Sequence, residues 1–135
     1  MSAAFNPFRY LKLAAQGNLE AQRELAEGAC HLFAEDGDLQ ALLDGLCFAR
    51  LAAAHGEAGD AGRLLAMLAL AGNSHMTEKD AELRFALAAE TIATVARLGE
   101  LGIDLADDGL DAMLADCTPE EVEAAQIIRR MMAEA

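Results

Sequence analysis

The chain has 135 residues, a formal net charge of −13 and 54% apolar residues, among which alanine and leucine predominate. This apolar content is too high for a chain that is disordered by composition, and the length suits one domain with a modest core. The negative charge disfavours nucleic acid as a partner, because cationic side chains are needed to displace counterions from phosphates. A basic protein or peptide is the favoured kind of partner.

The N-terminal segment and the cysteines set expectations about the compartment. Residues 1–16 lack the continuous apolar stretch of a signal peptide and carry Arg9 and Lys12. The most apolar run, 64–72, is far too short to cross a bilayer. The three cysteines are far apart and odd in number, which is not typical of a disulfide framework. We therefore expect a cytoplasmic protein that does not insert into a membrane.

The composition predicts an all-α protein, because alanine and leucine favour helices while β-branched and aromatic residues are scarce. Start and stop signals divide the chain into about seven helices. These are expected at about 7–16, 19–35, 39–55, 58–71, 78–100, within 105–116 and at about 119–134. No linker long enough to separate two domains is present, so residues 1–135 are expected to form one all-helical domain.

Capping residues indicate where several of these helices begin and end. Asn18 is expected to cap the second helix, and Gly37 with Asp38 to close it and open the third. Residues 77–80 predict a capping box for the fifth helix, with aspartate in place of the usual glutamate. Residues 118–121 (Thr-Pro-Glu-Glu) are the clearest such signal. The apolar stripe expected on the fifth helix consists of Phe85, Ala89, Ile92, Ala96 and Gly99.

The N-terminal half contains an internal repeat. The segment "YLKLAAQGNLEAQRELA" and a looser copy that begins near Phe48 share a double alanine, a glycine and a following alanine–leucine helix. The offset between the copies is about 39–40 residues, a period typical of helical-hairpin arrays. The helices that follow the glycine in the two copies align only if the turn of the second copy contains one extra residue. This alignment matches Arg23 with Arg63. The structural repeat positions are Tyr10, Ala14, Ala15, Gly17, Ala21 and Leu25 in the first copy and Ala53, Ala54, Gly56, Ala61 and Leu65 in the second.

This pattern resembles the Sel1-like repeat, a relative of the tetratricopeptide repeat. Gln22 also falls on a family position, whereas Ala26 stands where the family has a second glycine, and the second copy has Gly62 in place of the glutamine. The resemblance covers residues 8–72. It implies stacked antiparallel helical hairpins that form an α-α superhelix and hold other proteins, with no conserved catalytic residues. An unrelated α-helical bundle is the alternative.

The C-terminal part of the chain departs from the repeat. Residues 73–100 are expected to contain the long helix, and residues 101–135 to form an acidic helical cap over the end of the stack.

A non-enzymatic protein–protein interaction or adaptor module is the expected function. The predicted binding groove follows the helices at 19–35 and 58–71. Four side chains there are expected to lie outside the core and to contact a partner: Arg23, Glu27, Arg63 and Met67. The two arginines are expected to form a basic pair. Whether the protein is a monomer or a homo-oligomer stays open.

The competing interpretation is a helical bundle that binds a small apolar ligand, with the bundle either monomeric or dimeric. Its pocket would be lined by adaptable methionines, namely Met67, Met113, Met131 and Met132.

No motif of a nucleotide-binding site, a hydrolase or a metalloprotease occurs. The adjacent Cys30 and His31 point about 100° apart on a helix and do not easily share a zinc ion. We therefore predict no catalytic residue, no cofactor and no metal.

Overall fold

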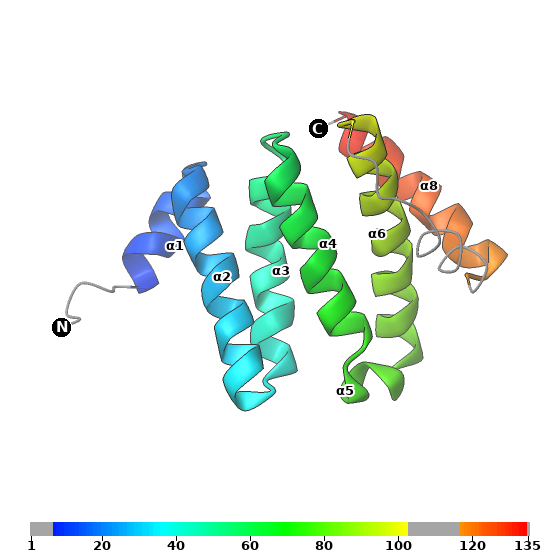
Figure 1. Cartoon of the computed structure of the whole chain (residues 1–135), viewed down its shortest axis with the longest axis horizontal. Helices are drawn as coiled ribbons and strands as arrows, with labels where there is room; N and C mark the ends of the chain where they lie inside the picture. Colours follow the sequence, from blue (N-terminus) through cyan, green and yellow to red (C-terminus); the bar gives the residue numbers. More distant parts are fainter. Residues whose placement is uncertain (1–6, 103–116, 135) are drawn as a thin grey trace.

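The computed structural model describes residues 7–102 and 117–134, which contain helices and no strand (Figure 1). The all-α prediction is confirmed for these residues. The helices are α1 (Pro7–Ala15), α2 (Leu19–Asp36), α3 (Leu39–Ala53), α4 (Ala58–Gly72), α5 (His75–Glu78), α6 (Ala81–Glu100) and α8 (Pro119–Glu134). The helix expected within 105–116 lies outside the described residues. Among the helices described, none combines the length and the apolar character that crossing a bilayer requires.

The helices pack in chain order. The extensive contacts join α1 to α2, α2 to α3, α3 to α4, α4 to α6 and α6 to α8, while the short α5 lies where α4 passes into α6. Figure 1 shows the long helices side by side, with neighbours running in opposite directions. This arrangement places α1 at one side of the molecule and α8 at the other.

The turns after α1 and α3 have the same backbone geometry. Gly17 has φ +92° and Gly56 has φ +94°, a left-handed conformation that glycine adopts without steric cost. In each turn the glycine N–H donates to the alanine carbonyl three positions earlier, at 3.0 Å. The next helix begins at the second position after the glycine in both cases, at Leu19 and at Ala58.

This common geometry corrects the alignment of the two hairpins. The offset from Gly17 to Gly56 equals the offset from Leu19 to Ala58, the first residues of α2 and α4. The second turn therefore contains no extra residue, contrary to the alignment that the alanine–leucine pattern favoured. In this register Arg23 corresponds to Gly62, so Arg23 and Arg63 are not equivalent.

Several predicted caps are confirmed. The side chain of Asn18 accepts from the N–H of Ala21 at 2.8 Å, and Asp38 accepts from the N–H of Ala41 at 3.1 Å. Gly37 closes α2 in the left-handed conformation, with φ +67°. Before α8, the N–H of Glu121 donates to Thr118 Oγ1 at 3.2 Å, and the N–H of Thr118 donates to Glu121 Oε1 at 3.4 Å.

The predicted capping box at residues 77–80 is wrong. Ser74 opens the separate short helix α5, and Thr77 lies inside it, fully buried, where its hydroxyl donates to the carbonyl of Ala71 at 2.6 Å. The long helix begins after Asp80 instead, whose carboxylate accepts from the N–H of Leu83 at 3.1 Å. The threonine hydroxyl thus closes the end of α4, and the aspartate takes the capping role.

The buried side chains form two clusters. The larger lies between α2, α3, α4 and the start of α6 and consists of Ala26, Ala29, Leu42, Leu46, Ala49, Leu64, Met67, Leu68, Ala71 and Leu87. The smaller joins α6 to α8 through Ile92, Ala93 and Ala125. Because α6 packs against α4 and against α8, its buried face is wider than the predicted stripe. Two members of the predicted stripe, Phe85 and Gly99, are exposed. Three residues outside it are buried, namely Leu87, Val95 and Leu98.

The two hairpins approach each other closely where α2 packs against α3. A Cβ atom placed on Gly45 of α3 would lie 2.1 Å from the Cβ of Ala29 on α2, well inside van der Waals contact. The same atom would lie 3.4 Å from Cε of Met67. Gly45 is therefore required by the space available and not by its backbone angles.

We expect Gly45→Ala to lower the free energy of unfolding by about 1–3 kcal/mol, because the added methyl group forces α2 and α3 apart. Gly28→Ala is the matched control, since Gly28 is an exposed residue of α2 whose added Cβ meets nothing within 4 Å. That variant should gain roughly 0.5–1 kcal/mol from helix propensity. Urea unfolding measures both, and equal effects of the two substitutions would contradict the close approach.

Candidate functional site

The residues predicted for a groove along α2 and α4 form ion pairs with one another and with nearby acids. Nε and Nη2 of Arg23 donate to the two carboxylate oxygens of Asp60 at 2.8 and 2.7 Å, and Nη2 also contacts Glu57. Nη2 of Arg63 donates to Glu27 Oε1 at 2.9 Å. Two arginines therefore face three carboxylates, and the expectation of a basic pair is wrong.

Asp60 is the buried member of this group. Its side chain is 2% exposed, so its charge is stabilised by the arginines and not by water. Hydrogen bonds from Arg23 hold the pKa of the Asp60 carboxyl below its ordinary value, and the positive charge of Arg63 acts in the same direction. The same pairing raises the pKa of Arg23.

Met67 belongs to the core. It is 1% exposed and packs in the larger buried cluster. The expectation that Met67 lies outside the core is wrong, because α4 buries the face that carries it against α3. Met67 is therefore not available to a partner on this surface.

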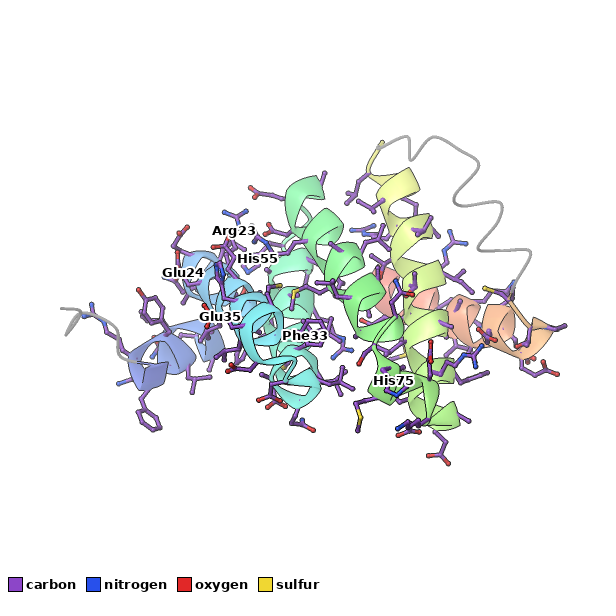
Figure 2. The ribbon with its side chains drawn as sticks, turned by 60° about the horizontal axis from the view of Figure 1, so that its bottom comes forward. Arg23, Glu24, Phe33, Glu35, His55 and His75 are labelled. Carbon is purple, nitrogen blue, oxygen red and sulfur yellow. The ribbon has the colours of Figure 1, made fainter. Side chains whose placement is uncertain are left out.

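A second polar contact between the hairpins was not predicted. The side chain of Gln22 is almost fully buried, donates from Nε2 to the carbonyl of Ala14 at 3.0 Å, and lies with Oε1 3.1 Å from Nε2 of His55. We call the seven side chains that join α2 to the turn after α3 and to α4 the polar seam: Gln22, Arg23, Glu27, His55, Glu57, Asp60 and Arg63. Figure 2 shows Arg23 and His55 close together near the start of α2, whereas His75 lies apart.

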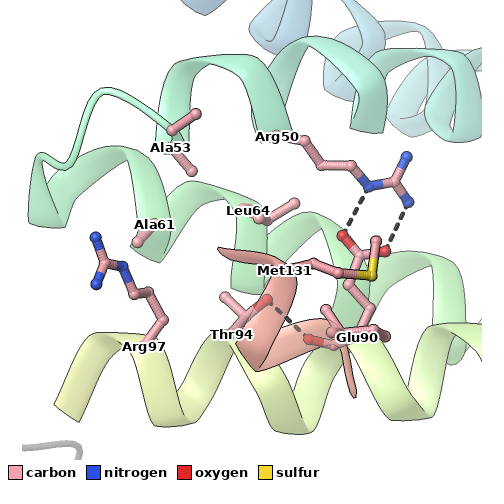
Figure 3. Close-up of a pocket in the computed structure, with 10 residues that line it drawn as sticks. Arg50, Ala53, Ala61, Leu64, Glu90, Thr94, Arg97 and Met131 are labelled. Atoms are coloured by element: carbon pink, nitrogen blue, oxygen red, sulfur yellow. Dashed lines mark hydrogen bonds and ion pairs between the residues drawn. The ribbon is translucent and has the colours of Figure 1, made fainter. Parts of the chain in front are cut away.

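A groove lies elsewhere, between α3 and α8, with residues of α4 and α6 at its base. Its volume is about 410 Å³ (Figure 3). The lining residues are Arg50, Ala53, Ala54, Ala61, Leu64, Glu90, Thr94, Arg97, Ile128 and Met131. Six of these ten are apolar, and three of the six are alanines. The alanines line the groove because their side chains are too short to fill the space between the helices.

Charged residues mark the two ends of the groove. At one end Arg50 donates from Nε and Nη2 to the two carboxylate oxygens of Glu90, both at 2.7 Å. At the other end Arg97 donates to Glu100 at 3.2 Å (Figure 3 shows Arg97 opposite the Arg50–Glu90 pair). Buried Thr94 lies between them, and its hydroxyl donates to the carbonyl of Glu90 at 2.8 Å.

Sequence reasoning identified only parts of this groove. Ala53, Ala54 and Ala61 were predicted as packing positions of the repeat, and they line the groove instead of filling it. Met131 was predicted to line a ligand pocket, and it does line the groove. Met113 and the side chain of Met132 lie outside what the structure describes. The only local signal for the groove was the density of alanine, which equally predicts tight packing.

The ends of α6 and α8 carry several basic side chains. Glu100 accepts from Arg97 and, at 2.8 Å, from Arg129, so one carboxylate pairs with two guanidinium groups. The hydrogen bond from Arg129 and that from Arg97 lower the pKa of Glu100. Arg129 and Arg130 also line a shallower hollow of about 500 Å³ together with Glu100 and Gln126.

The described side chains offer no group of three Cys, His, Asp or Glu residues that would hold a metal ion. The lining residues of the groove offer apolar burial together with ion pairing by arginine.

The pairing of Asp60 predicts a pH dependence of stability. Because the folded pKa of Asp60 is below its unfolded value of about 4, the pair contributes its full stabilisation above pH 5, and this contribution is lost as the pH falls through the folded pKa. We expect Asp60→Asn to unfold at lower urea concentration than the wild type at pH 7, and this difference should shrink towards pH 3. Glu78→Asn, an exposed carboxylate far from the seam, is the control. A difference independent of pH would contradict the role of the carboxylate charge.

Comparison of the chain with protein-family models, curated proteins and solved structures found no match. Functional inference for this protein therefore starts from the groove and the polar seam.

Proposed function

We propose that this protein is a protein–protein interaction module built from stacked helical hairpins of the Sel1-like kind, and that the groove between α3 and α8 is its binding surface. The matching turns at Gly17 and Gly56, each followed by a helix that starts at the same distance from the glycine, support the repeat. The packing of each helix on the next also fits a stack of hairpins. The family resemblance supplies the expected role, which is to hold another protein.

The observation that carries this proposal is the open apolar surface around the groove. Met131 on α8, one of the six apolar lining residues, is 62% exposed. The six come from α3 and the residue after it, from α4 and from α8, so apolar side chains line the groove from more than one helix. Apolar surface of this kind, with charged residues at its ends, is typical of sites that bind a protein segment.

The polar seam is a less suitable binding surface than the groove. Each of its arginines already pairs with carboxylates of the same chain, and a partner would have to break those pairs. The apolar middle of the groove needs no such exchange, because its side chains lose only water when a partner covers them. The proposed site therefore uses a different face of α4 from the surface predicted from sequence.

Substitution of Met131 tests this proposal. Full burial of a methionine side chain contributes about 1.5–3 kcal/mol. We therefore expect Met131→Gln to lower the affinity for the partner at least about tenfold. Met76→Gln is the matched control, because Met76 is similarly exposed at 59% but lies on α5, away from the groove. Affinity capture from the native cell with mass spectrometry identifies the partner, and titration with the purified partner measures the affinities. A partner that binds both variants equally well, or the absence of any reproducible partner, would contradict the groove as the site.

One observation favours a second candidate function. The groove volume of about 410 Å³ falls in the range of roughly 300–1,000 Å³ found for small-molecule sites. Native mass spectrometry of the protein purified from its own cell separates the two functions. The interaction module is expected to show the mass of the chain alone. An added mass of one small apolar molecule, lost in Met131→Gln and kept in Met76→Gln, would instead establish the ligand-binding function.

A further inference from the structure

The groove ends beside a local excess of positive charge in a chain of net charge −13. Arg97, Arg129 and Arg130 lie near the ends of α6 and α8. Within the described residues, Glu100 is the acid that pairs with Arg97 and Arg129, and no ion pair of Arg130 is found. Among the described residues, two guanidinium groups thus pair with one carboxylate and a third lies in the same hollow, which favours an anionic group at this end of the groove.

The opposite end of the groove is electrically balanced. Arg50 makes two parallel hydrogen bonds to Glu90, and the Glu90 side chain is only 13% exposed. This bidentate geometry leaves little of the Arg50 charge for another partner. The groove is thus asymmetric, with an apolar middle, a neutral end at the Arg50–Glu90 pair and a positive end at Arg97.

The length of the groove fits two turns of a helix. Glu90, Thr94 and Arg97 lie on successive turns of α6, so the groove extends about 10 Å along that helix. Two side chains that are three or four positions apart on a bound helix lie roughly 5–6 Å from each other. Two such side chains therefore fit between the Arg50–Glu90 pair and Arg97.

The walls of the groove also suit a helix. The groove lies between α3 and α8, and the alanines at positions 53, 54 and 61 keep its surface close to the backbone. A small side chain is what permits α2 to approach α3 at Ala29 and Gly45. The same kind of surface here permits a further helix to approach closely.

We propose that the groove binds an amphipathic α-helix of a partner protein, which inserts two aliphatic side chains and pairs an aspartate or glutamate with Arg97. This inference rests on the proposed function and specifies its partner. The acidic residue lies three or four positions beyond the nearer aliphatic side chain, because Arg97 is one helical turn from Thr94. The overall charge of the chain favours basic partners, but at this groove the arginines select an acidic one.

A displayed library of random 16-residue peptides tests the inference without knowledge of the natural partner. Selection is carried out on the immobilised full-length chain, and peptides that bind Met131→Gln equally well are removed. We expect the remaining peptides to share two aliphatic residues at helical spacing and an aspartate or glutamate one turn away. Circular dichroism of one synthesised peptide should show helix forming when the chain is added.

Charge reversal at Arg97 identifies the acidic contact. We expect Arg97→Glu to bind the selected peptide about fivefold or more weakly, the upper end for a partly exposed ion pair. A peptide with lysine in place of its acidic residue should bind Arg97→Glu better than it binds the wild type. Arg84→Glu is the control, because Arg84 is an exposed residue near the other end of α6. Thermal unfolding confirms that both variants are folded.

The outcomes separate this inference from the proposed function. If no selected peptide distinguishes the wild type from Met131→Gln, both the groove as a protein-binding site and the present inference are overturned. If groove-binding peptides are found but lack a shared acidic residue, or if Arg97→Glu leaves their affinity unchanged, only the acidic helix is overturned. If Arg97→Glu binds the lysine-containing peptide better than the wild type does, this result supports the contact between Arg97 and the acidic residue.

Discussion

The contact between Ala29 and Gly45 determines how closely the first hairpin approaches the second. Because Gly45 has no Cβ atom, the Cβ of Ala29 packs directly against the backbone of α3, and the side chains of α2 also reach beyond α3. Arg23 therefore reaches the buried carboxylate of Asp60 on α4, and Gln22 reaches His55 in the turn. We expect a larger residue at position 45 to weaken these contacts, and a buried Asp60 without its arginine would be costly.

Most helix boundaries could be predicted from the sequence because capping depends on residues a few positions apart. Asn18, Asp38 and Thr118 each bond to a backbone N–H three positions away, so local sequence is sufficient. Thr77 shows the limit of this reasoning. Its hydroxyl has two available partners, a following N–H or the carbonyl of Ala71, and the burial of α5 against its neighbours favours the second.

The groove could not be predicted in the same way, because its lining comes from α3, α4, α6 and α8. An alanine such as Ala61 is compatible with close packing and equally with an open space, and only the positions of the neighbouring helices distinguish the two. The pairing of Arg23 was missed for a related reason. The pattern of alanine and leucine aligned it with Arg63, whereas the turn geometry shows that its counterpart is a glycine. Side-chain chemistry could be recognised from the sequence, but distances between hairpins could not.

The buried glutamine also affects how the N-terminal part of the molecule unfolds. Nε2 of Gln22 donates to the carbonyl of Ala14, and its Oε1 lies within hydrogen-bonding distance of Nε2 of His55. An isolated helix as short as α1 is unstable in water. If α1 separated alone, the amide of Gln22 would lose its carbonyl partner, and the position of His55 would change with it. We therefore expect the end of α1 and the turn between α3 and α4 to open together in hydrogen exchange, although two complete helices separate them in the sequence.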